Sequence, residues 1–312
     1  MLTKDSQIGV TSRTFCRSKE LRDLLETKFK NVKYNEEGLI FDERDLVDFL
    51  YDCEGVIVSE DKITNVVIER LPNLKILSKF GVGLDSVDLD SLARNGIELS
   101  WKPGLNAHSV AELALCYLIL LLREAYQLNR DLMLGSWSKV KNSRDLSEVV
   151  VGIIGYGQIG KTLISYLKPF KTDILVFDPL IDKNSVLPKK VKSVEFREVL
   201  KQSDAISIHV PLIKDTLGLI SKKEISLMKE GSVLVNLSRG KVVDEDAVYN
   251  GLTRGSLGGA AFDVFALEPD NNPDLVKLNN FFCTPHIAGT SKNTIKELGL
   301  SAIDGLIECL EK

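Results

Sequence analysis

The stretch VVVGIIGYGQIG, residues 149–160, joins an apolar run to three glycines with G-x-G-x-x-G spacing. The run Val149–Ile154 has the β-branched composition of a buried strand, and Gln158–Leu167 has the pattern of a helix. Asp178 follows 18 residues after the last of these glycines, at the end of the next apolar run. A strand, a glycine turn, a helix and then an acidic residue predict a dinucleotide-binding unit.

The glycines and the acidic residue suit this function for physical reasons. Gly155 allows a tight turn, Gly157 lets the backbone approach a pyrophosphate, and Gly160 lets the helix pack closely on the strand. The start of the helix offers N–H groups and a positive dipole end to phosphate. Asp178 can accept hydrogen bonds from the adenosine ribose and would repel a 2′-phosphate, so the pattern favours NAD over NADP. A glycine-rich turn without a ligand is the alternative.

The alternation of strands and helices extends in both directions from this unit. The expected strands are Gln7–Thr11, Gly55–Val58, Leu74–Ser78, Ile97–Trp101, Val149–Ile154, Asp173–Phe177, Ala205–Val210, Ser232–Leu237, Leu257–Val264 and Phe281–Thr284. The expected helices are Lys19–Phe29, Thr64–Leu71, Leu89–Asn95, Ser109–Leu122, Gln158–Leu167 and Lys292–Leu310. Such alternation favours parallel α/β layers. The run Lys189–Lys192 is expected to be a solvated loop.

The composition is that of a globular protein and excludes several functional classes. With 312 residues, of which 44% are hydrophobic and 27% charged, two domains are expected. A net charge of −4 offers no basic face to nucleic acid. The longest apolar run, Leu113–Leu122, is about half of a membrane span, and no export signal is evident, so we expect a cytoplasmic protein without membrane partners.

The cysteines indicate neither a metal site nor a disulfide framework. They are odd in number and far apart, and none forms a C-x-x-C pair: Cys16, Cys53, Cys116, Cys283 and Cys309. We expect reduced thiols and no bound metal.

Polar side chains that could carry acid–base chemistry follow three of the expected strands. Arg239, Glu268 and His286 each lie in such a segment, and open α/β sheets bind ligands at the carboxyl ends of their strands. Arg239 could bind a carboxylate. Glu268 could hold one nitrogen of His286 and raise its pKa, leaving the other nitrogen to move a proton. Taken singly, each residue also fits an ordinary surface or loop position.

An ordered series of motifs resembles the D-isomer-specific 2-hydroxyacid dehydrogenase family along nearly the whole chain. Besides the glycine turn, these motifs are Lys79-Phe80-Gly81-Val82-Gly83-Leu84-Asp85-Ser86-Val87-Asp88, Pro103-Gly104-Leu105-Asn106, Ser109-Val110-Ala111-Glu112, His209-Val210-Pro211-Leu212, Ser238-Arg239-Gly240, Ala261-Phe262-Asp263-Val264-Phe265, Glu268-Pro269 and Thr284-Pro285-His286. Any one of them alone would be weak evidence. Their number and order make the resemblance specific.

The resemblance implies roles for the three candidates. Arg239 matches the arginine that binds the substrate carboxylate and polarises the keto oxygen. Glu268 matches the acid that pairs with the catalytic histidine, and His286 matches that histidine. His209 matches a family position near the cofactor and is interpreted as structural, and His108 is expected to have no chemical role.

The resemblance also implies cofactor and substrate contacts. Asp263 matches the aspartate that faces the nicotinamide carboxamide, and the backbone of Val82 and Gly83 matches the loop around the substrate carboxylate. Lys79 matches a basic position that faces phosphate in the phosphoglycerate enzymes of the family. The full set of residues expected at the NAD site is Gly155, Gly157, Gln158, Ile159, Gly160, Asp178, Val210, Leu237, Asp263, His286 and Ala288.

The family architecture implies two doubly wound parallel-sheet α/β domains with a cleft between them. A flavodoxin-like substrate domain would comprise residues 1–103 and be completed by a C-terminal helix over residues 290–312. A Rossmann NAD domain would comprise residues 104–289. Family members are usually dimers through their cofactor domains, so we expect a homodimer. The apolar segment Leu113–Leu122 is consistent with a dimer contact or with a core helix.

The activity implied is NAD-dependent hydride transfer between nicotinamide and C2 of a D-2-hydroxyacid. A non-enzymatic NAD(H)-sensing protein is the alternative, because corepressors resemble the same family and can keep all three candidate residues. Formate dehydrogenase, a family relative, has glutamine in place of Glu268 and is therefore disfavoured. The sequence ends at Lys312, so no C-terminal regulatory domain is expected.

The substrate is not expected to be 3-phosphoglycerate. Phosphoglycerate enzymes of the family have a phosphate-binding arginine just after the strand that here is Gly55–Val58, where this chain has Ser59-Glu60-Asp61. Glu60 would repel a dianion and would suit a tail that carries hydroxyl or amine groups. Lys79 is opposing evidence, since it keeps one positive charge available. A solvated acidic turn is the alternative interpretation.

Overall fold

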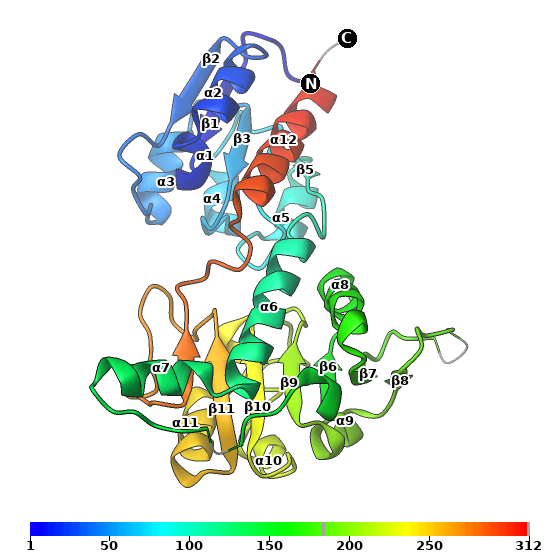
Figure 1. The fold of residues 1–312 in the computed structure, drawn as a ribbon. Coiled ribbons are helices and arrows are strands. Elements are labelled where there is room, and N and C mark those ends of the chain that lie inside the picture. Colours follow the sequence, from blue (N-terminus) through cyan, green and yellow to red (C-terminus); the bar gives the residue numbers. More distant parts are fainter. Residues whose placement is uncertain (141, 183–184, 311–312) are drawn as a thin grey trace. The chain divides into compact units, whose positions relative to one another are not determined.

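The computed structural model describes residues 1–140, 142–182 and 185–310, and its chain divides into two α/β units. The first unit comprises Met1–Asn106 together with the chain from Thr290 onward, and the second comprises Ala107–Gly289 (Figure 1). The division thus falls after Asn106 rather than after Pro103, and again after Gly289. Of the C-terminal segment expected to complete the first unit, positions 311–312 lie outside the described residues.

A parallel sheet with strand order β2-β1-β3-β4-β5 forms the first unit. Its strands are β1 (Gln7–Val10), β2 (Asn31–Tyr34), β3 (Gly55–Val58), β4 (Ile76–Lys79) and β5 (Glu98–Ser100). Its helices are α1 (Arg13–Cys16), α2 (Lys19–Glu26), α3 (Glu43–Leu50), α4 (Asn65–Glu69), α5 (Leu89–Arg94) and α12 (Lys292–Glu308). This strand order is flavodoxin-like, with the reversal of direction between β1 and β3.

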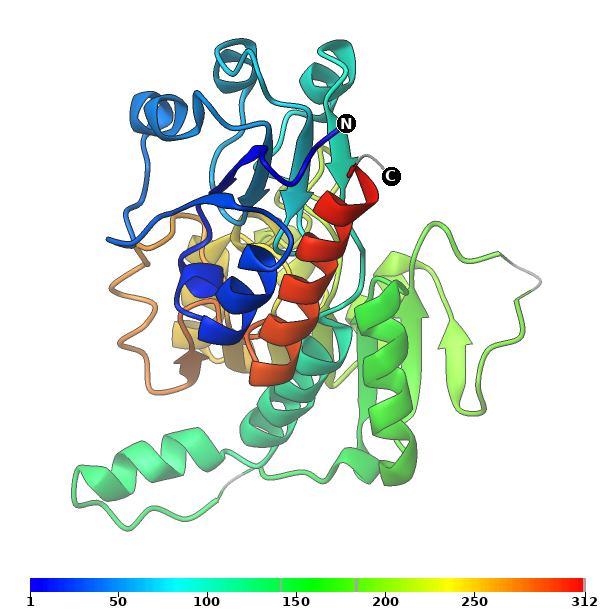
Figure 2. The same cartoon turned by 90° about the horizontal axis from the view of Figure 1, so that it is seen from above.

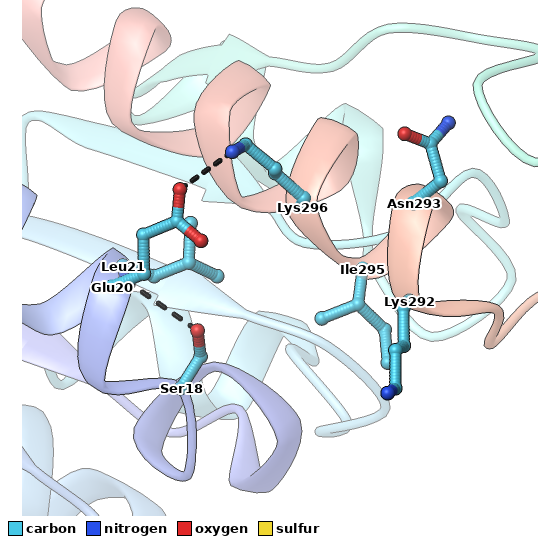
Figure 3. Close-up of a pocket in the computed structure, with 7 residues that line it drawn as sticks. All are labelled: Ser18, Glu20, Leu21, Lys292, Asn293, Ile295 and Lys296. Atoms are coloured by element: carbon cyan, nitrogen blue, oxygen red, sulfur yellow. Dashed lines mark hydrogen bonds and ion pairs between the residues drawn. The ribbon is translucent and has the colours of Figure 1, made fainter.

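The last helix, α12, packs beside α2 although it is the most distant element in sequence (Figure 2). Lys296 of α12 forms an ion pair with Glu20 of α2 at 2.6 Å, and Ser18 caps the start of α2 (Figure 3). On the sheet side, the Ser78 hydroxyl donates to the carbonyl of Ala302 at 2.7 Å. The apolar face of α12 joins the same buried cluster as Leu21. Helix α12 is therefore held on the first sheet and on α2 by specific contacts.

A seven-stranded parallel sheet forms the second unit in the order β12-β11-β10-β9-β6-β7-β8. The strands are β6 (Val150–Ile154), β7 (Asp173–Phe177), β8 (Val191–Ser193), β9 (Ala205–Ile208), β10 (Ser232–Asn236), β11 (Leu257–Phe262) and β12 (Phe281–Cys283). The α-helices are α6 (Ala107–Leu122), α7 (Ala125–Met133), α8 (Gln158–Leu167), α9 (Phe196–Gln202), α10 (Lys222–Ile225) and α11 (Glu245–Arg254), with short 3₁₀ turns η1 (Leu146–Glu148), η2 (Lys168–Phe170) and η3 (Gly240–Val242). The order from β8 to β11 is that of a Rossmann fold.

Two buried clusters, one on each face, hold this second sheet. Helices α6 and α8 contribute to one cluster, and α9 and α11 contribute to the other. The apolar side chains of α6 include Tyr117 and Leu118, which are at most 1% exposed. The segment Leu113–Leu122 is thus largely a core helix of the second unit. No described helix is long and apolar enough to cross a membrane.

The expectation of a solvated loop at Lys189–Lys192 was wrong in part. Val191 and Lys192 belong to β8, where Val191 pairs with Ile174 of β7 and is 8% exposed. A three-residue edge strand between charged residues carries too little periodicity to be recognised. The edge strand β2 of the first sheet was missed for the same reason, since Asn31–Tyr34 buries none of its side chains fully.

Candidate active site

Three neighbouring strands of the second sheet carry the expected catalytic side chains. Arg239 follows β10, Glu268 follows β11 and His286 follows β12. These strands are parallel and adjacent in the order β12-β11-β10, so their carboxyl ends meet at one edge of the sheet. Residues far apart in the chain are brought together there.

His286 and Glu268 form a hydrogen bond of 2.7 Å between Nδ1 and Oε2. The other oxygen of Glu268 accepts from the Phe265 amide at 2.8 Å, which orients the carboxylate. The bond to Glu268 is the main cause of a raised pKa at His286, and burial opposes it. Burial alone would raise the pKa of Glu268, but the donors His286 and Phe265 lower it overall. Because Nδ1 faces the carboxylate, Nε2 is the nitrogen that can exchange a proton with a ligand.

Arg239 lies on a loop packed directly against the segment that leads to Glu268. A Cβ added to Gly240 would lie 1.9 Å from the carbonyl carbon of Phe265, so only glycine allows this approach. Asn236 stabilises the loop, because its Nδ2 donates to the Arg239 carbonyl at 3.0 Å. The guanidinium donates to the Ser238 carbonyl at 2.8 Å. Its charge acts on both His286 and Glu268.

Asp263 is fully buried beneath the His286 loop. Its Oδ1 accepts from the Ile287 amide and from the Thr284 hydroxyl, and its Oδ2 accepts from the Ala288 amide. Burial raises the pKa of Asp263, and these donors oppose that rise. A carboxylate offers about four acceptor positions, so Oδ2 retains one that a nicotinamide carboxamide could use. The contact implied for Asp263 by the family resemblance is chemically compatible with this arrangement.

The glycine turn between β6 and α8 has the geometry of a phosphate site. Gly155 has φ of +104°, and an added Cβ at Gly160 would lie 2.1 Å from the Gly155 carbonyl oxygen. A Cβ at Gly157, in contrast, would meet no atom within 4 Å. The start of α8 lacks a side-chain cap, so its first N–H groups can bind a dinucleotide pyrophosphate.

Asp178 stabilises this turn from the end of β7. Its Oδ2 accepts from the Tyr156 amide at 2.7 Å, and its Oδ1 accepts from the Leu180 amide at 2.8 Å. Each oxygen keeps a further acceptor position for a ribose hydroxyl. The carboxylate thus lies beside the turn, as the sequence pattern predicts.

The remaining expected cofactor residues differ in how they could contact a ligand. Gln158 and Ile159 form the first turn of α8, and Val210 lies beside Gly155. Leu237 and Ala288 are only 5% and 4% exposed and belong to a buried cluster. Their side chains therefore pack in the core, which leaves mainly backbone atoms for a cofactor.

The expected substrate contacts lie in the first unit, after β4. The Trp101 indole donates to the Val82 carbonyl at 2.9 Å and so holds the loop that contains Gly83. Within the described part of the chain, the amides of Val82 and Gly83 donate no hydrogen bond. Two successive N–H groups of this kind can bind a carboxylate. Lys79 is 6% exposed, and its ammonium group donates to the Ser59 carbonyl and to the Ser86 hydroxyl.

Arg13 was not among the residues expected from the sequence. Its guanidinium forms an ion pair with Glu60 at 3.0 Å, and both side chains are exposed. Arg13 follows β1 and Glu60 follows β3, so the pair lies where the strand order reverses. This position could have indicated Arg13 from the sequence, because open α/β sheets bind ligands at the point where the strand order reverses. Asp61 beside it accepts from the Thr11 hydroxyl and from the Ser59 amide.

The other two histidines have different surroundings. His209 is buried and its Nε2 is hydrogen bonded to the Ser207 hydroxyl at 2.8 Å. Burial lowers the pKa of His209 to about 3, so this imidazole stays neutral. His108 is exposed in the first turn of α6, where Nδ1 contacts the Tyr166 hydroxyl at 2.7 Å. In the described ranges, no group of three or more His, Cys, Asp or Glu side chains is arranged to hold a metal.

Comparison with known proteins shows the family of this chain. The model of the family described as "D-isomer specific 2-hydroxyacid dehydrogenase, NAD binding domain" matches residues 115–288. The chain belongs to the D-isomer specific 2-hydroxyacid dehydrogenase family. Its second unit is the NAD-binding domain of that family, and NAD is its cofactor.

Relatives in this family carry several names. The chain is 32% identical over 295 residues to a hydroxypyruvate reductase of Thermotoga maritima. This alignment covers 93% of this chain and 94% of the relative. It is 34% identical over 258 residues to a D-3-phosphoglycerate dehydrogenase of Archaeoglobus fulgidus, covering 81% of this chain but only 49% of that relative. The chain thus spans about half the length of the Archaeoglobus protein. A D-lactate dehydrogenase of Aquifex aeolicus, solved with NAD and lactic acid, has a TM-score of 0.82 at 26% identity and covers 96% of this chain and 94% of its own.

Proposed function

We propose that this protein is a cytoplasmic NAD-dependent D-2-hydroxyacid dehydrogenase that acts on the CH–OH group of its donor. The observation that carries the proposal is the 2.7 Å bond between His286 and Glu268 at the sheet edge that also bears Arg239. The same sheet carries the open glycine turn. An acid–base pair, a cation and a dinucleotide site on one sheet are the groups that this reaction requires.

Each residue has a defined task in the proposed reaction. Bound NAD supplies the hydride acceptor, and NADH the donor. In oxidation, Nε2 of neutral His286 takes the hydroxyl proton, while Glu268 stabilises the imidazolium that forms. In reduction, protonated His286 returns that proton to the carbonyl oxygen. Arg239 binds the substrate carboxylate and stabilises charge on the oxygen. In the first unit, the amides of Val82 and Gly83 are a second group of donors that can bind a carboxylate.

Steady-state assays of the purified protein with NADH and a panel of 2-keto acids test this function. His286→Ala should lose about 10²–10⁴-fold in kcat, since general acid–base catalysis contributes that much, and should still bind NADH in a fluorescence titration. His108→Ala is the matched control, because it removes an exposed histidine outside the site. Binding of NADH without turnover of any keto acid by the wild type would instead favour the NAD(H)-sensing alternative.

We infer further that the substrate has an uncharged or hydroxyl-bearing tail rather than a phosphate. Glu60 stands where phosphoglycerate enzymes are expected to have a cation, and its ion pair with Arg13 balances the charge of that guanidinium. Lys79 is turned to the Ser59 carbonyl beneath the same turn. The pair offers both donors and an acceptor, which suits a hydroxyl group. Similarity to a hydroxypyruvate reductase supports this choice.

Two keto acids that differ only at the tail test the inference on substrate. We expect a higher kcat/KM for hydroxypyruvate than for 3-phosphohydroxypyruvate. Glu60→Gln should narrow this difference, because it leaves the Arg13 guanidinium without its counter-charge. Glu36→Gln is a matched control, since that carboxylate pairs with Arg22 elsewhere in the first unit. An efficiency for the phosphorylated substrate far above all others would contradict the inference.

We also propose that the protein is a homodimer through its second unit. Helix α7 binds that unit on one side, where Arg130 donates to the Leu278 carbonyl at 2.9 Å. Beyond this contact, α7 and the segment after it expose a cluster of large apolar side chains, here called the α7 patch: Leu132, Met133, Leu134, Trp137 and Val140, each 55–84% exposed. Contiguous exposed apolar side chains of this size are typical of a protein interface.

A further inference from the structure

The backbone that carries His286 is held from below by Asp263. The amides of Ile287 and Ala288 donate to its two carboxylate oxygens, each at 2.8 Å, and the His286 amide donates to its carbonyl at 2.9 Å. His286 itself has φ of +53°. A non-glycine residue keeps this left-handed conformation only where its surroundings impose it. Asp263 therefore determines the direction in which the imidazole leaves the loop.

Two hydroxyl groups extend this network from Asp263 to helix α6. Thr284 donates to Oδ1 of Asp263, and the Tyr117 hydroxyl contacts the Thr284 hydroxyl. An ionised carboxylate only accepts, and a threonine hydroxyl has a single hydrogen, so Tyr117 must be the donor to Thr284. Burial raises the pKa of Tyr117, so the phenol keeps this proton. The bonds then run in one direction, from Tyr117 through Thr284 to Asp263.

Tyr117 is anchored well enough to act as the fixed end of this network. Its side chain is 1% exposed on α6. Its ring meets the edge of Phe282 with centroids 5.2 Å apart, and Phe282 lies in β12, the strand that leads into the His286 loop. Tyr126 packs on the same Phe282 ring, but its hydroxyl contacts Arg130 instead. Only one of the two tyrosine hydroxyls therefore reaches the site.

We propose that Tyr117 and Thr284 are positioning residues that act through Asp263 to hold the His286 loop, so that helix α6 sets the orientation of the catalytic imidazole. The inference rests on the proposed function in one respect, the role of His286 as acid and base. It assigns a purpose to the hydroxyls of buried Tyr117 and half-buried Thr284, which form no hydrogen bond with Glu268 or Arg239 within the described residues. The hydrogen bonds in a chain that ends on a buried charge strengthen one another. Loss of one hydroxyl should therefore weaken the bonds between Asp263 and the His286 loop.

The pKa of His286 reports on this positioning. The charged groups that act on its imidazole are Glu268 and Asp263 from the segment after β11 and Arg239 from the segment after β10. Its hydrogen bond to Glu268 is the largest of these influences and raises the pKa. If the loop relaxes, this bond weakens and the pKa of His286 falls. A residue that only filled space in the core would leave this value unchanged.

The test compares variants that keep or remove single hydroxyls. Thr284→Val removes the hydroxyl at nearly constant size, and Thr284→Ser keeps it. We expect about a tenfold loss of kcat in Thr284→Val and about a 2- to 10-fold loss in Tyr117→Phe, as for lost hydrogen bonds. Thr284→Ser should stay close to wild type. Tyr126→Phe is the control, because it removes the hydroxyl of the other tyrosine that packs on the Phe282 ring, and that hydroxyl contacts Arg130.

The double variant shows whether Tyr117 acts through Thr284 or whether the two hydroxyls act independently. If Tyr117 acts only through Thr284, Tyr117→Phe should add nothing in the Thr284→Val background. Imidazole titration by NMR gives a readout that does not need turnover, and with only three histidines in the chain His286 is readily assigned. Thr284→Val and Tyr117→Phe should lower its pKa, and Thr284→Ser should not. If Thr284→Val and Tyr117→Phe both keep the wild-type kcat and the wild-type pKa of His286, the proposed positioning role is wrong. If the wild type is inactive but the two variants still shift this pKa, the result counts against the proposed function alone.

Discussion

Proton exchange at His286 is determined by the few charged groups around one imidazole. Glu268 holds Nδ1 and raises the pKa, Asp263 raises it further, and burial and Arg239 lower it. The net effect is a pKa above the ordinary value of about 6.5. A raised pKa increases the fraction of His286 that is protonated at any given pH, which suits reduction of a keto acid.

The pH dependence of Glu268→Gln follows from this balance. Keto acid reduction needs protonated His286, so kcat/KM should fall as pH rises through its pKa. Glu268→Gln removes the main influence that raises the pKa of His286. The descending limb of the pH profile of kcat/KM should therefore move to lower pH. At pH 8 the variant should lose more activity than at pH 6. Rate profiles of both proteins over pH 5–9 measure the shift, and an unmoved limb would contradict the role of Glu268.

At the scale of elements, the start of α8 is where we propose that the glycine turn meets the cofactor. The three glycines differ in what surrounds them, since Gly160 is enclosed by backbone and Gly157 faces open space. This difference predicts opposite effects for two otherwise identical substitutions. Gly160→Ala should destabilise the fold by about 1–3 kcal/mol, as overpacking does. Gly157→Ala should leave the melting temperature near wild type and weaken NAD binding at least about tenfold.

Calorimetric melting and NADH fluorescence titration of the two variants measure these effects. A Gly157→Ala protein that binds NADH as tightly as wild type would mean that the pyrophosphate does not approach this turn.

The end of β7 predicts the choice between the two nicotinamide cofactors. Asp178 places a carboxylate beside the turn, and Asp178→Asn removes the charge but keeps an oxygen that can accept from the Tyr156 amide. We expect wild type to prefer NADH over NADPH and the variant to show a smaller preference, because repulsion of the 2′-phosphate is gone. The ratio of kcat/KM for the two reduced cofactors is the measurement. A native preference for NADPH would show that Asp178 does not face the ribose.

At the scale of the molecule, the proposed dimer depends on the α7 patch. Substituting Met133 and Trp137 by serine removes two of its most exposed apolar side chains. We expect wild type to sediment with twice the mass of the chain and the double variant to shift towards monomer at micromolar concentration. Val186→Ser is the control, since Val186 is 98% exposed in the same unit but lies outside the patch. A wild-type monomer would remove the α7 patch as an interface.

Local patterns were sufficient to predict parallel α/β layers, whereas the two doubly wound domains and the roles of the candidate site residues came from the family resemblance. Apolar runs, glycine spacing and helix-ending prolines act over a few neighbouring residues, and such short-range signals are legible in one sequence. Arg239, Glu268 and His286 could be selected as candidates because each follows a recognisable strand, and strand ends gather at one edge of a parallel sheet. The short edge strands β2 and β8 gave no such signal.

Contacts between distant parts of the chain were decided only by the tertiary structure. Arg13 and Glu60 are 47 residues apart, and Tyr117 and Thr284 are 167 apart. The sequence alone determined that a carboxylate stands at position 60 and that a dinucleotide turn follows β6. Which side chain balances that carboxylate, and which hydroxyl supports the His286 loop, depends on how strands and helices pack side by side. No local periodicity encodes such neighbours, because they are set by the order of strands within each sheet.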